Sequence, residues 1–358
     1  MRMRVMDLGM VPAIRSQAVF HGVAETMDAD SDPVLLLVSP QTPYVCVGMH
    51  QQVDREVDED FCKAHDLPVY RRHVGGGAVY LDKDQYFTHF IFPKDKAPKR
   101  ADQLYPLFIE PVVRTYREFG IPAQFRPAND IHVNGRKIGG TGAASIGDAT
   151  VMVGSFMFDF DTETMSRCLK VPSEKFRDKL RTTLDDYMTT MVKELKDVPT
   201  RERLRDAFLA HCAAVLNVTP EMDSLNEREL AAIAESEKQL ADPEWTYMQG
   251  RKFVEMGVKI SAGTHLTESA HKAPGGLIRI NLLARDGRID DLMIAGDFTC
   301  LPPLGVDDMA ALLRGKELNA VSLEAAIVGI VESLGIEMPG ITPRDIATAI
   351  MMAYEPPE

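Results

Sequence analysis

The residues with the clearest chemical potential lie in the stretch RRHVGGGAVYLD, from Arg71 to Asp82. Each glycine inside packed structure costs roughly 0.5 to 1 kcal/mol relative to alanine, so a run of glycines needs a compensating reason. Without Cβ atoms, their backbone N–H groups can approach a ligand closely, and Arg71 and Arg72 are placed to meet its negative charge. The same residues could instead form a glycine turn between two strands, with solvated arginines. The stretch therefore indicates an anion site without requiring one.

A second stretch, NDIHVNGRKIGGTG from Asn129 to Gly142, holds one lysine, Lys137. This lysine follows an Asn-Gly hairpin signal and precedes another glycine cluster. A lysine on a strand between tight turns is rigidly aimed. Taken alone it could be an exposed strand charge. Combined with the earlier glycine loop, it predicts a site for phosphate and carboxylate groups.

Both stretches resemble the signature of the lipoate-protein ligase A family of the biotin/lipoate ligase superfamily, which runs RRxSGGGAVxHD, then ND, then GRKIxGSA. The resemblance extends over essentially the whole chain and includes the accessory C-terminal domain of the bacterial two-domain form. It implies activation of lipoate by ATP to lipoyl-adenylate, then transfer of the lipoyl group to a lysine of an acceptor protein. The matching residues are Arg71, Arg72, Gly75 to Val79, Asp82, Asn129, Asp130 and Gly135 to Ile138.

Carried over residue by residue, the resemblance implies a role for each matched position. A carboxylate that attacks an α-phosphorus brings two negative groups together, so Lys137, as the catalytic residue, and Arg72 would neutralise charge. Asp130 is the expected Mg²⁺ ligand. The residues expected to contact ATP or lipoyl-adenylate are Arg72, Gly77, Ala78, Val79, Tyr80, Asn129 and Lys137. Those expected to contact lipoate are Arg71, Gly75, Gly76, Gly77, Lys137 and Gly140.

The chain departs from the family pattern at three places. Val74 replaces the serine before the glycines, Leu81 replaces the histidine before Asp82, and GGTGAA follows Ile138 where SGSAQ is usual. These changes alter the pocket wall rather than the charged groups, so we expect activity to be retained while acyl or acceptor preference shifts.

The expected acceptor is a lipoyl domain or protein of the H-protein or dehydrogenase E2 type. The pattern is also similar to a divergent ligase branch that serves dedicated lipoate-binding proteins of a heterodisulfide-reductase-like sulfur oxidation system. That second similarity adds a sulfur-oxidation protein to the candidate acceptors.

Three other functions are open on the same scaffold. Lipoate-pathway octanoyltransferases use a cysteine nucleophile near the lysine, but no cysteine lies between Cys62 and Cys168. Biotin ligases carry an arginine-glycine loop, GRGRxGR, that is absent from this sequence. A non-catalytic lipoate-binding module would release no pyrophosphate with any acid.

The resemblance implies an α+β fold: a mixed sheet flanked by helices, like that of class II aminoacyl-tRNA synthetases and biotin ligases, plus a small α+β accessory domain. A chain of 358 residues exceeds the usual single core. We expect a catalytic domain over residues 1–245 and an accessory domain over residues 250–358.

Local patterns predict the elements that position these residues. Ser16 is a candidate cap for a helix over 16–27, and Pro111 either kinks or divides a helix over 102–119. A half-buried strand holds His89, and a further helix covers 183–195. Asp286-Gly287 joins two strands in a hairpin, and Thr342 with Asp345 caps the last helix.

Composition limits the partners and the compartment. A formal charge of −13 with no basic run argues against nucleic-acid and anionic-membrane binding. The five cysteines are scattered without CxxC spacing, so we interpret them as small buried hydrophobes. The N-terminus lacks the apolar core of a secretory signal. We therefore expect a cytoplasmic protein, and we expect a monomer.

Overall fold

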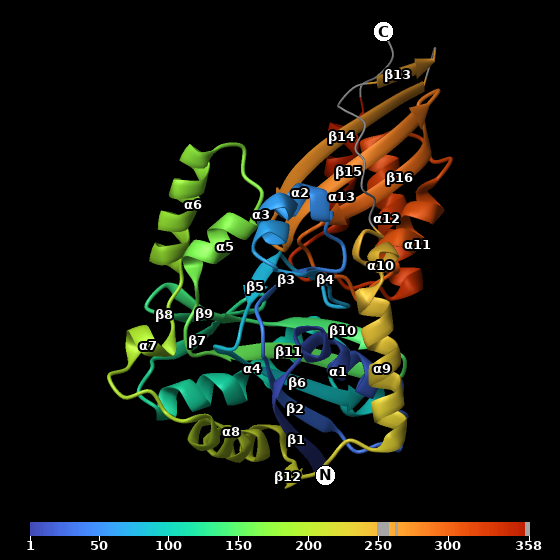
Figure 1. Ribbon diagram of the computed structural model, residues 1–358. Coiled ribbons are helices and arrows are strands. Elements are labelled where there is room, and N and C mark those ends of the chain that lie inside the picture. Colours follow the sequence, from blue (N-terminus) through green and yellow to red (C-terminus); the bar gives the residue numbers. More distant parts are fainter. Residues whose placement is uncertain (249–257, 262–263, 355–358) are drawn as a thin grey trace. The chain divides into compact units, whose positions relative to one another are not determined.

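The structure is a computed structural model that describes residues 1–248, 258–261 and 264–354 (Figure 1). The start of the accessory domain that we placed at residue 250 lies outside these described residues. The chain divides into two compact units. The first comprises Met1–Cys46, Glu56–Arg72 and Val79–Thr246, and the second comprises Val47–Arg55, His73–Ala78 and Tyr247–Glu358.

A six-stranded mixed sheet forms the centre of the first unit. Strand β1 runs parallel to both of its neighbours, β2 and β12, and the other neighbouring pairs are antiparallel. Strands β2 and β6 are buried along their whole length, as expected for strands covered on both faces. In spatial order the strands are β10 (Gly142–Ile146), β11 (Ala149–Met157), β6 (Gln85–Pro93), β2 (Val34–Pro40), β1 (Arg2–Val11) and β12 (Thr219–Met222).

Helices cover both faces of this sheet. Because side chains alternate along a strand, Phe90 of β6 packs against Phe108 of α4 and Phe208 of α8, whereas His89 meets Phe20 of α1 on the opposite face. Helix α9 packs on α1. These helices are α1 (Ala13–Glu25), α4 (Ala101–Glu118), α8 (Arg201–Leu216) and α9 (Glu227–Ala241).

Two three-stranded sheets, in the orders β4-β3-β5 and β7-β8-β9, carry the two sequence motifs. Arg71 is the last residue of β4, Arg72 follows it, and Lys137 lies on β9. The remaining elements before residue 247 are β3 (Tyr44–Val47), β4 (Val69–Arg71), β5 (Val79–Leu81), β7 (Ala123–Arg126), β8 (Asp130–Val133), β9 (Arg136–Gly140), α2 (Val53–Glu56), α3 (Glu59–Ala64), the 3-10 helix η1 (Lys94–Lys96), α5 (Thr162–Cys168), α6 (Glu174–Tyr187), α7 (Met191–Glu194) and α10 (Pro243–Thr246).

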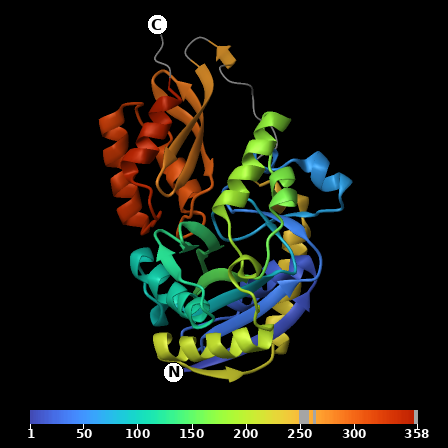
Figure 2. The same ribbon diagram turned by 90° about the vertical axis from the view of Figure 1, so that its left-hand side faces the viewer.

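The second unit is a four-stranded antiparallel sheet with helices packed on one face, as Figure 2 shows. Burial alternates along β15, so Ile278, Ile280 and Leu282 face a core shared with Met309 and Ile327 of the helices. Its elements are β13 (Val258–Ser261), β14 (Thr264–Ala273), β15 (Gly276–Arg285), β16 (Arg288–Gly296), α11 (Gly305–Leu313), α12 (Ala320–Leu334) and α13 (Pro343–Met352).

This architecture confirms the fold class and several local predictions. Asp286 and Gly287 both have positive φ and connect β15 to β16. Thr342 and Asp345 form a capping box at the start of α13. All five cysteines are buried, and none forms a disulfide. Among the helices in the described ranges, none combines the length and apolar character that crossing a bilayer requires.

Two local predictions are wrong because tertiary contacts override the local pattern, and one of the two alternatives for Pro111 is excluded. Helix α1 begins after Pro12, and the Ser16 hydroxyl lies inside it, 2.9 Å from the hydroxyl of Tyr44. Pro111 lies inside α4, which continues to Glu118, so it does not divide the helix. The helix over 183–195 is broken between α6 and α7, where the Thr189 N–H donates to the carbonyl of Lys137 at 2.9 Å.

The sequence patterns also missed a strand and misjudged a histidine. Strand β1 pairs with β2, and its Met3 and Val5 are buried on either side of a half-buried Arg4. His89 is 2% exposed rather than half-buried, and it lies between the rings of Phe20 and Phe87. Burial lowers its pKa to about 3.

His89 should make the first unit sensitive to acid. The unfolded side chain takes up a proton near pH 6.5 and the folded one only near pH 3, so stability is lost as the pH falls through that interval. The loss at pH 5 should be roughly 2 kcal/mol. Urea unfolding at pH 8 and pH 5 gives the decrease in the free energy of unfolding between the two pH values. In His89→Phe this decrease should be about 2 kcal/mol smaller than in the wild type. An equal decline in both proteins would contradict the assignment.

Candidate active site

The hairpin formed by β8 and β9 fixes the position of Lys137. Asn134 and Gly135 at its tip have φ values of 49° and 83°, in the left-handed region that Asn-Gly turns supply at low cost. Strand β8 pairs with β7 on its other side. The lysine therefore projects from a short sheet, as its sequence setting predicted.

The Lys137 ammonium forms an ion pair with Asp130, with 2.7 Å between Nζ and Oδ1. The lysine side chain is 28% exposed and the aspartate side chain 22%, so both remain accessible from solvent while most of their surface is covered. Asp130 is directly opposite Gly140 across the hairpin. A Cβ atom on Gly140 would lie 3.0 Å from Nζ and 3.1 Å from Cε of the lysine. The missing side chain at Gly140 leaves the space that the ammonium occupies.

Two residues that sequence reasoning did not assign to the site lie on the other side of Asp130. The Tyr187 hydroxyl at the end of α6 is 3.5 Å from Oδ2 of Asp130 and 3.4 Å from Nε2 of His132. Burial, followed by the charge of Asp130, raises the pKa of Tyr187. His132 could have been found from its spacing, two residues after Asp130 on the same strand. No sequence signal links Tyr187 to this hairpin.

Hydrogen bonds between Asn129 and Thr141 close the base of the hairpin. The Asn129 side-chain amide donates to the Thr141 carbonyl at 2.6 Å, and the Thr141 hydroxyl and N–H both donate to the Asn129 carbonyl at 2.9 Å. On the outer side, Glu194 accepts hydrogen bonds from Thr189 and Arg136. Asn129 and Thr141, which belongs to the GGTGAA departure, therefore hold the segment that carries Lys137.

The two arginines of the first motif have different environments. Arg71 is fully buried, and its guanidinium donates to the backbone carbonyl of Thr246 at the end of α10. Burial lowers the pKa of Arg71 to about 10. Arg72 is half-buried, and its Nη1 donates to the Cys46 carbonyl at 3.2 Å.

The residues after the glycine run lie on the same small sheet as Arg71. Val79 of β5 pairs with Cys46 of β3. Tyr80 is 6% exposed, its backbone N–H is 3.1 Å from the Met165 sulfur, and burial raises its pKa. The first unit therefore holds Arg71, Val79 and Tyr80 on one small sheet, with Arg72 directly after its strand β4, and Lys137 on another sheet.

The glycine run itself belongs to the second unit, together with residues 47–55 and the segment after β16. A Cβ atom on Gly75 would lie 2.3 Å from the Phe298 carbonyl oxygen, and the Gly76 N–H donates to that oxygen at 3.1 Å. At Gly77 the nearest atom would be 4.0 Å away, on Asp297. Close approach is therefore required at Gly75, and in this structure the approaching group is protein backbone.

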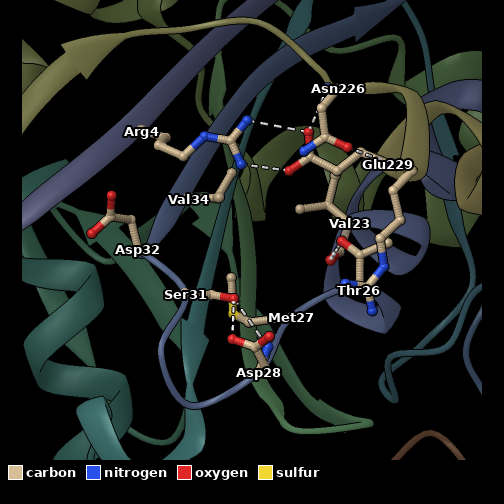
Figure 3. A pocket seen from close by; sticks show the side chains of 11 residues that line it. Arg4, Val23, Thr26, Met27, Asp28, Ser31, Asp32, Val34, Asn226 and Glu229 are labelled. Carbon is tan, nitrogen blue, oxygen red and sulfur yellow. Dashed lines mark hydrogen bonds and ion pairs between the residues drawn. The ribbon is translucent and has the colours of Figure 1, made fainter.

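A separate pocket in the first unit contains none of the predicted site residues (Figure 3). It holds about 200 Å³, below the roughly 300 to 1,000 Å³ typical of ligand sites. Arg4, which lines it, is paired with Glu229 and Asp223, and this pairing joins β1 to the start of α9. We interpret the pocket as a structural polar cluster.

Comparison with known proteins identifies the family. The lipoyl protein ligase A/B catalytic domain matches residues 15–213, which are 199 of the 358 residues, and the bacterial lipoate protein ligase C-terminus matches residues 265–350. The chain is thus an enzyme of the biotin/lipoate ligase class. It belongs to the lipoyl protein ligase A/B family.

Individual relatives fall into two activity groups. Lipoate-protein ligase LplJ of Bacillus subtilis is 27% identical over 309 residues, covering 84% of this chain and 86% of that protein. Octanoyltransferase LipM of Kyrpidia tusciae is 27% identical over 241 residues, covering 60% and 87%. A solved structure of the bipartite lipoate protein ligase of Thermoplasma acidophilum has a TM-score of 0.64 and 25% identity, covering 71% of this chain and 99% of that one.

The space at Gly140 gives a matched pair of variants. In Gly140→Ala the new methyl group would displace the Lys137 ammonium, so we expect the family's adenylation reaction, measured as pyrophosphate release, to fall about tenfold or more. In Gly139→Ala the new Cβ would meet its nearest atom at 3.5 Å, an ordinary contact. That control should stay within about twofold of the wild type. Equal effects at the two positions would show that Gly140 does not serve the lysine.

Proposed function

We propose that this chain is an ATP-dependent lipoate-protein ligase. The observation that carries the proposal is Lys137, held beside Asp130 on a rigid hairpin within the family's motif. A lipoate carboxylate oxygen would attack the α-phosphorus of ATP and release pyrophosphate. The lysine amine of an acceptor would then attack the acyl carbonyl of lipoyl-adenylate, release AMP and leave an amide bond.

Lys137 has the geometry to balance the charge that develops in the first step. Its ammonium is already paired with a carboxylate in a partly covered site, so an incoming carboxylate or phosphate would take over or share that partner. Arg72 would supply a second positive charge. Alongside them, the nucleotide would be bound by Gly77, Ala78, Val79, Tyr80 and Asn129, and the lipoyl chain by Gly75, Gly76, Gly77 and Gly140.

Asp130 could hold Mg²⁺ only as a single protein carboxylate that acts together with the phosphates of ATP. Within the described ranges, no group of three or more His, Cys, Asp or Glu residues could hold a metal ion. Mg²⁺ at nucleotide sites is commonly held by one or two carboxylates together with substrate phosphates. Asp130 would supply a single carboxylate, and the bound ion would neutralise phosphate charge.

The acceptor would be a lipoyl domain or protein. The Thermoplasma ligase is described together with its E2 lipoyl domain, which supports a dehydrogenase E2-type acceptor. H-protein-like domains and dedicated lipoate-binding proteins of sulfur oxidation are the other candidates. An ATP-dependent mass shift assay with lipoate and octanoate, run on each acceptor class, would identify the partner and the preferred acyl group.

The alternative function is octanoyl transfer through a cysteine thioester, the activity named for LipM. That chemistry needs an accessible thiolate. All five cysteines are buried, and burial raises the pKa of the Cys46, Cys212 and Cys300 thiols. A hydrogen bond with Cys62, together with burial, raises the pKa of Cys168. The same hydrogen bond lowers the pKa of Cys62, but that side chain is buried and only 1% exposed. These environments favour the ligase, whose activated acyl donor is the adenylate itself.

Replacing Lys137 should abolish activation without unfolding the protein. Lys137→Ala should reduce lipoate-dependent pyrophosphate release at least about 100-fold, because it removes a charge worth on the order of 3 kcal/mol in the transition state. Lys238→Ala is the matched control, since Lys238 is 74% exposed on α9. Near-normal release by Lys137→Ala would refute the assigned role.

Cysteine substitution separates ligase from transferase. Cys168→Ala should retain transfer from supplied lipoyl-adenylate to an acceptor domain, apart from a stability loss for the lost packing. Intact mass spectrometry after incubation with an octanoyl thioester should find no acyl group on any cysteine. A trapped thioester on Cys168, together with loss of transfer in a folded Cys168→Ala protein, would favour the transferase.

A further inference from the structure

Arg71 and Trp245 hold each other through reciprocal side-chain and backbone contacts in the first unit. The Arg71 guanidinium donates to the carbonyl of Trp245 at 3.2 Å and to that of Thr246 at 3.0 and 2.7 Å. In return, the Trp245 indole N–H donates to the carbonyl of Arg71 at 3.0 Å. The contacts join β4 to the end of α10 across 174 positions of sequence.

The burial of Arg71 needs an explanation. Its side chain is 0% exposed, and removing a guanidinium from water is costly unless hydrogen bonds compensate. The carbonyls at the end of a helix lack intrahelical donors and are suitable partners. Although burial lowers its pKa to about 10, Arg71 remains protonated at neutral pH. In this conformation, the Nε and Nη2 donors of the guanidinium are directed at backbone carbonyls.

The Trp245 contact also fixes the residue that follows Arg71. The Arg71 carbonyl belongs to the peptide bond that joins it to Arg72, so the indole N–H sets the orientation of that peptide plane. The Arg72 side chain is held from another direction by the Cys46 carbonyl. Cys46 in turn pairs with Val79. The direction of Arg72 therefore depends on a tryptophan far away in the sequence.

We propose that Arg71 and Trp245 are positioning residues that aim Arg72 at the nucleotide, and that Arg71 does not itself bind lipoate. This inference rests on the proposed adenylation function and assigns to Arg71 a role different from the one that its motif implied. Trp245 lies outside both sequence motifs, and it is the single tryptophan of the chain.

The test combines Trp245→Phe with Arg72→Ala in the full-length protein. Trp245→Phe keeps an aromatic ring and removes the N–H donor. We expect the dissociation constant for ATP, measured by calorimetry without lipoate, to rise about tenfold, the usual effect of losing one hydrogen bond next to a charged group. The KM for lipoate in pyrophosphate release should change less than about twofold, because lipoate would not contact Arg72. Glu244→Gln, at an exposed position of the same short helix, is the matched control and should match the wild type.

The double variant decides whether Trp245 acts through Arg72. In the Arg72→Ala background, adding Trp245→Phe should change ATP affinity less than about twofold, because coupled residues give non-additive effects. A full tenfold loss in that background, or no loss in a folded Trp245→Phe protein, would overturn the inference.

Arg71 itself is tested by a conservative variant. Arg71→Lys keeps a cation that can donate to the Thr246 carbonyl, so its ATP affinity should stay within about threefold of the wild type. Arg71→Met removes the cation, and its ATP affinity should fall by more than that. An increase in the KM for lipoate with unchanged ATP affinity in Arg71→Lys would instead support direct lipoate binding. ATP binding and pyrophosphate release by the wild-type protein distinguish a failure of the proposed function from a failure of the positioning role. ATP binding without lipoate-dependent pyrophosphate release would refute the function alone, and no ATP binding would refute both.

Discussion

The ion pair between Lys137 and Asp130 is the interaction on which the proposed chemistry depends. An isolated ammonium in a partly covered site would be costly, and a freely moving one would be poorly aimed. The hairpin solves both problems, because a tight Asn-Gly turn fixes the strands and Gly140 leaves space beside the carboxylate. Asp130 thus holds the lysine side chain in place until an anionic substrate arrives.

The glycines of the two motifs serve different physical purposes. Gly140 makes room for a side chain that carries charge, whereas Gly75 lets a loop approach the backbone at Phe298 within the second unit. Two of the three departures from the family motif also separate in this way. Thr141 takes part in closing the lysine hairpin through Asn129, while Val74 is buried and its carbonyl accepts the Met49 N–H at 3.0 Å. None of the departures removes a charged group that the proposed reaction uses.

The sequence was sufficient to predict structure where the contacts that determine it are local. The Asn134-Gly135 turn, the Asp286-Gly287 hairpin and the capping box at Thr342 follow from neighbouring residues, and the structure confirms them. It was insufficient where a partner lies far along the chain. The contact between Arg71 and Trp245 could not be foreseen from the motif, and Tyr187 was missed for the same reason. A motif gives the residue types of a site, and tertiary packing decides which of them remain available.

The most direct test is a structure of the full-length protein with a non-hydrolysable lipoyl-adenylate analogue. We expect Lys137 Nζ to lie about 2.7 to 3.1 Å from the acyl carbonyl oxygen or from the group that replaces the phosphate, as is usual for a donor that stabilises developing charge. Binding of the analogue without contact to Lys137, with the lysine paired only with Asp130, would contradict the role assigned to this residue.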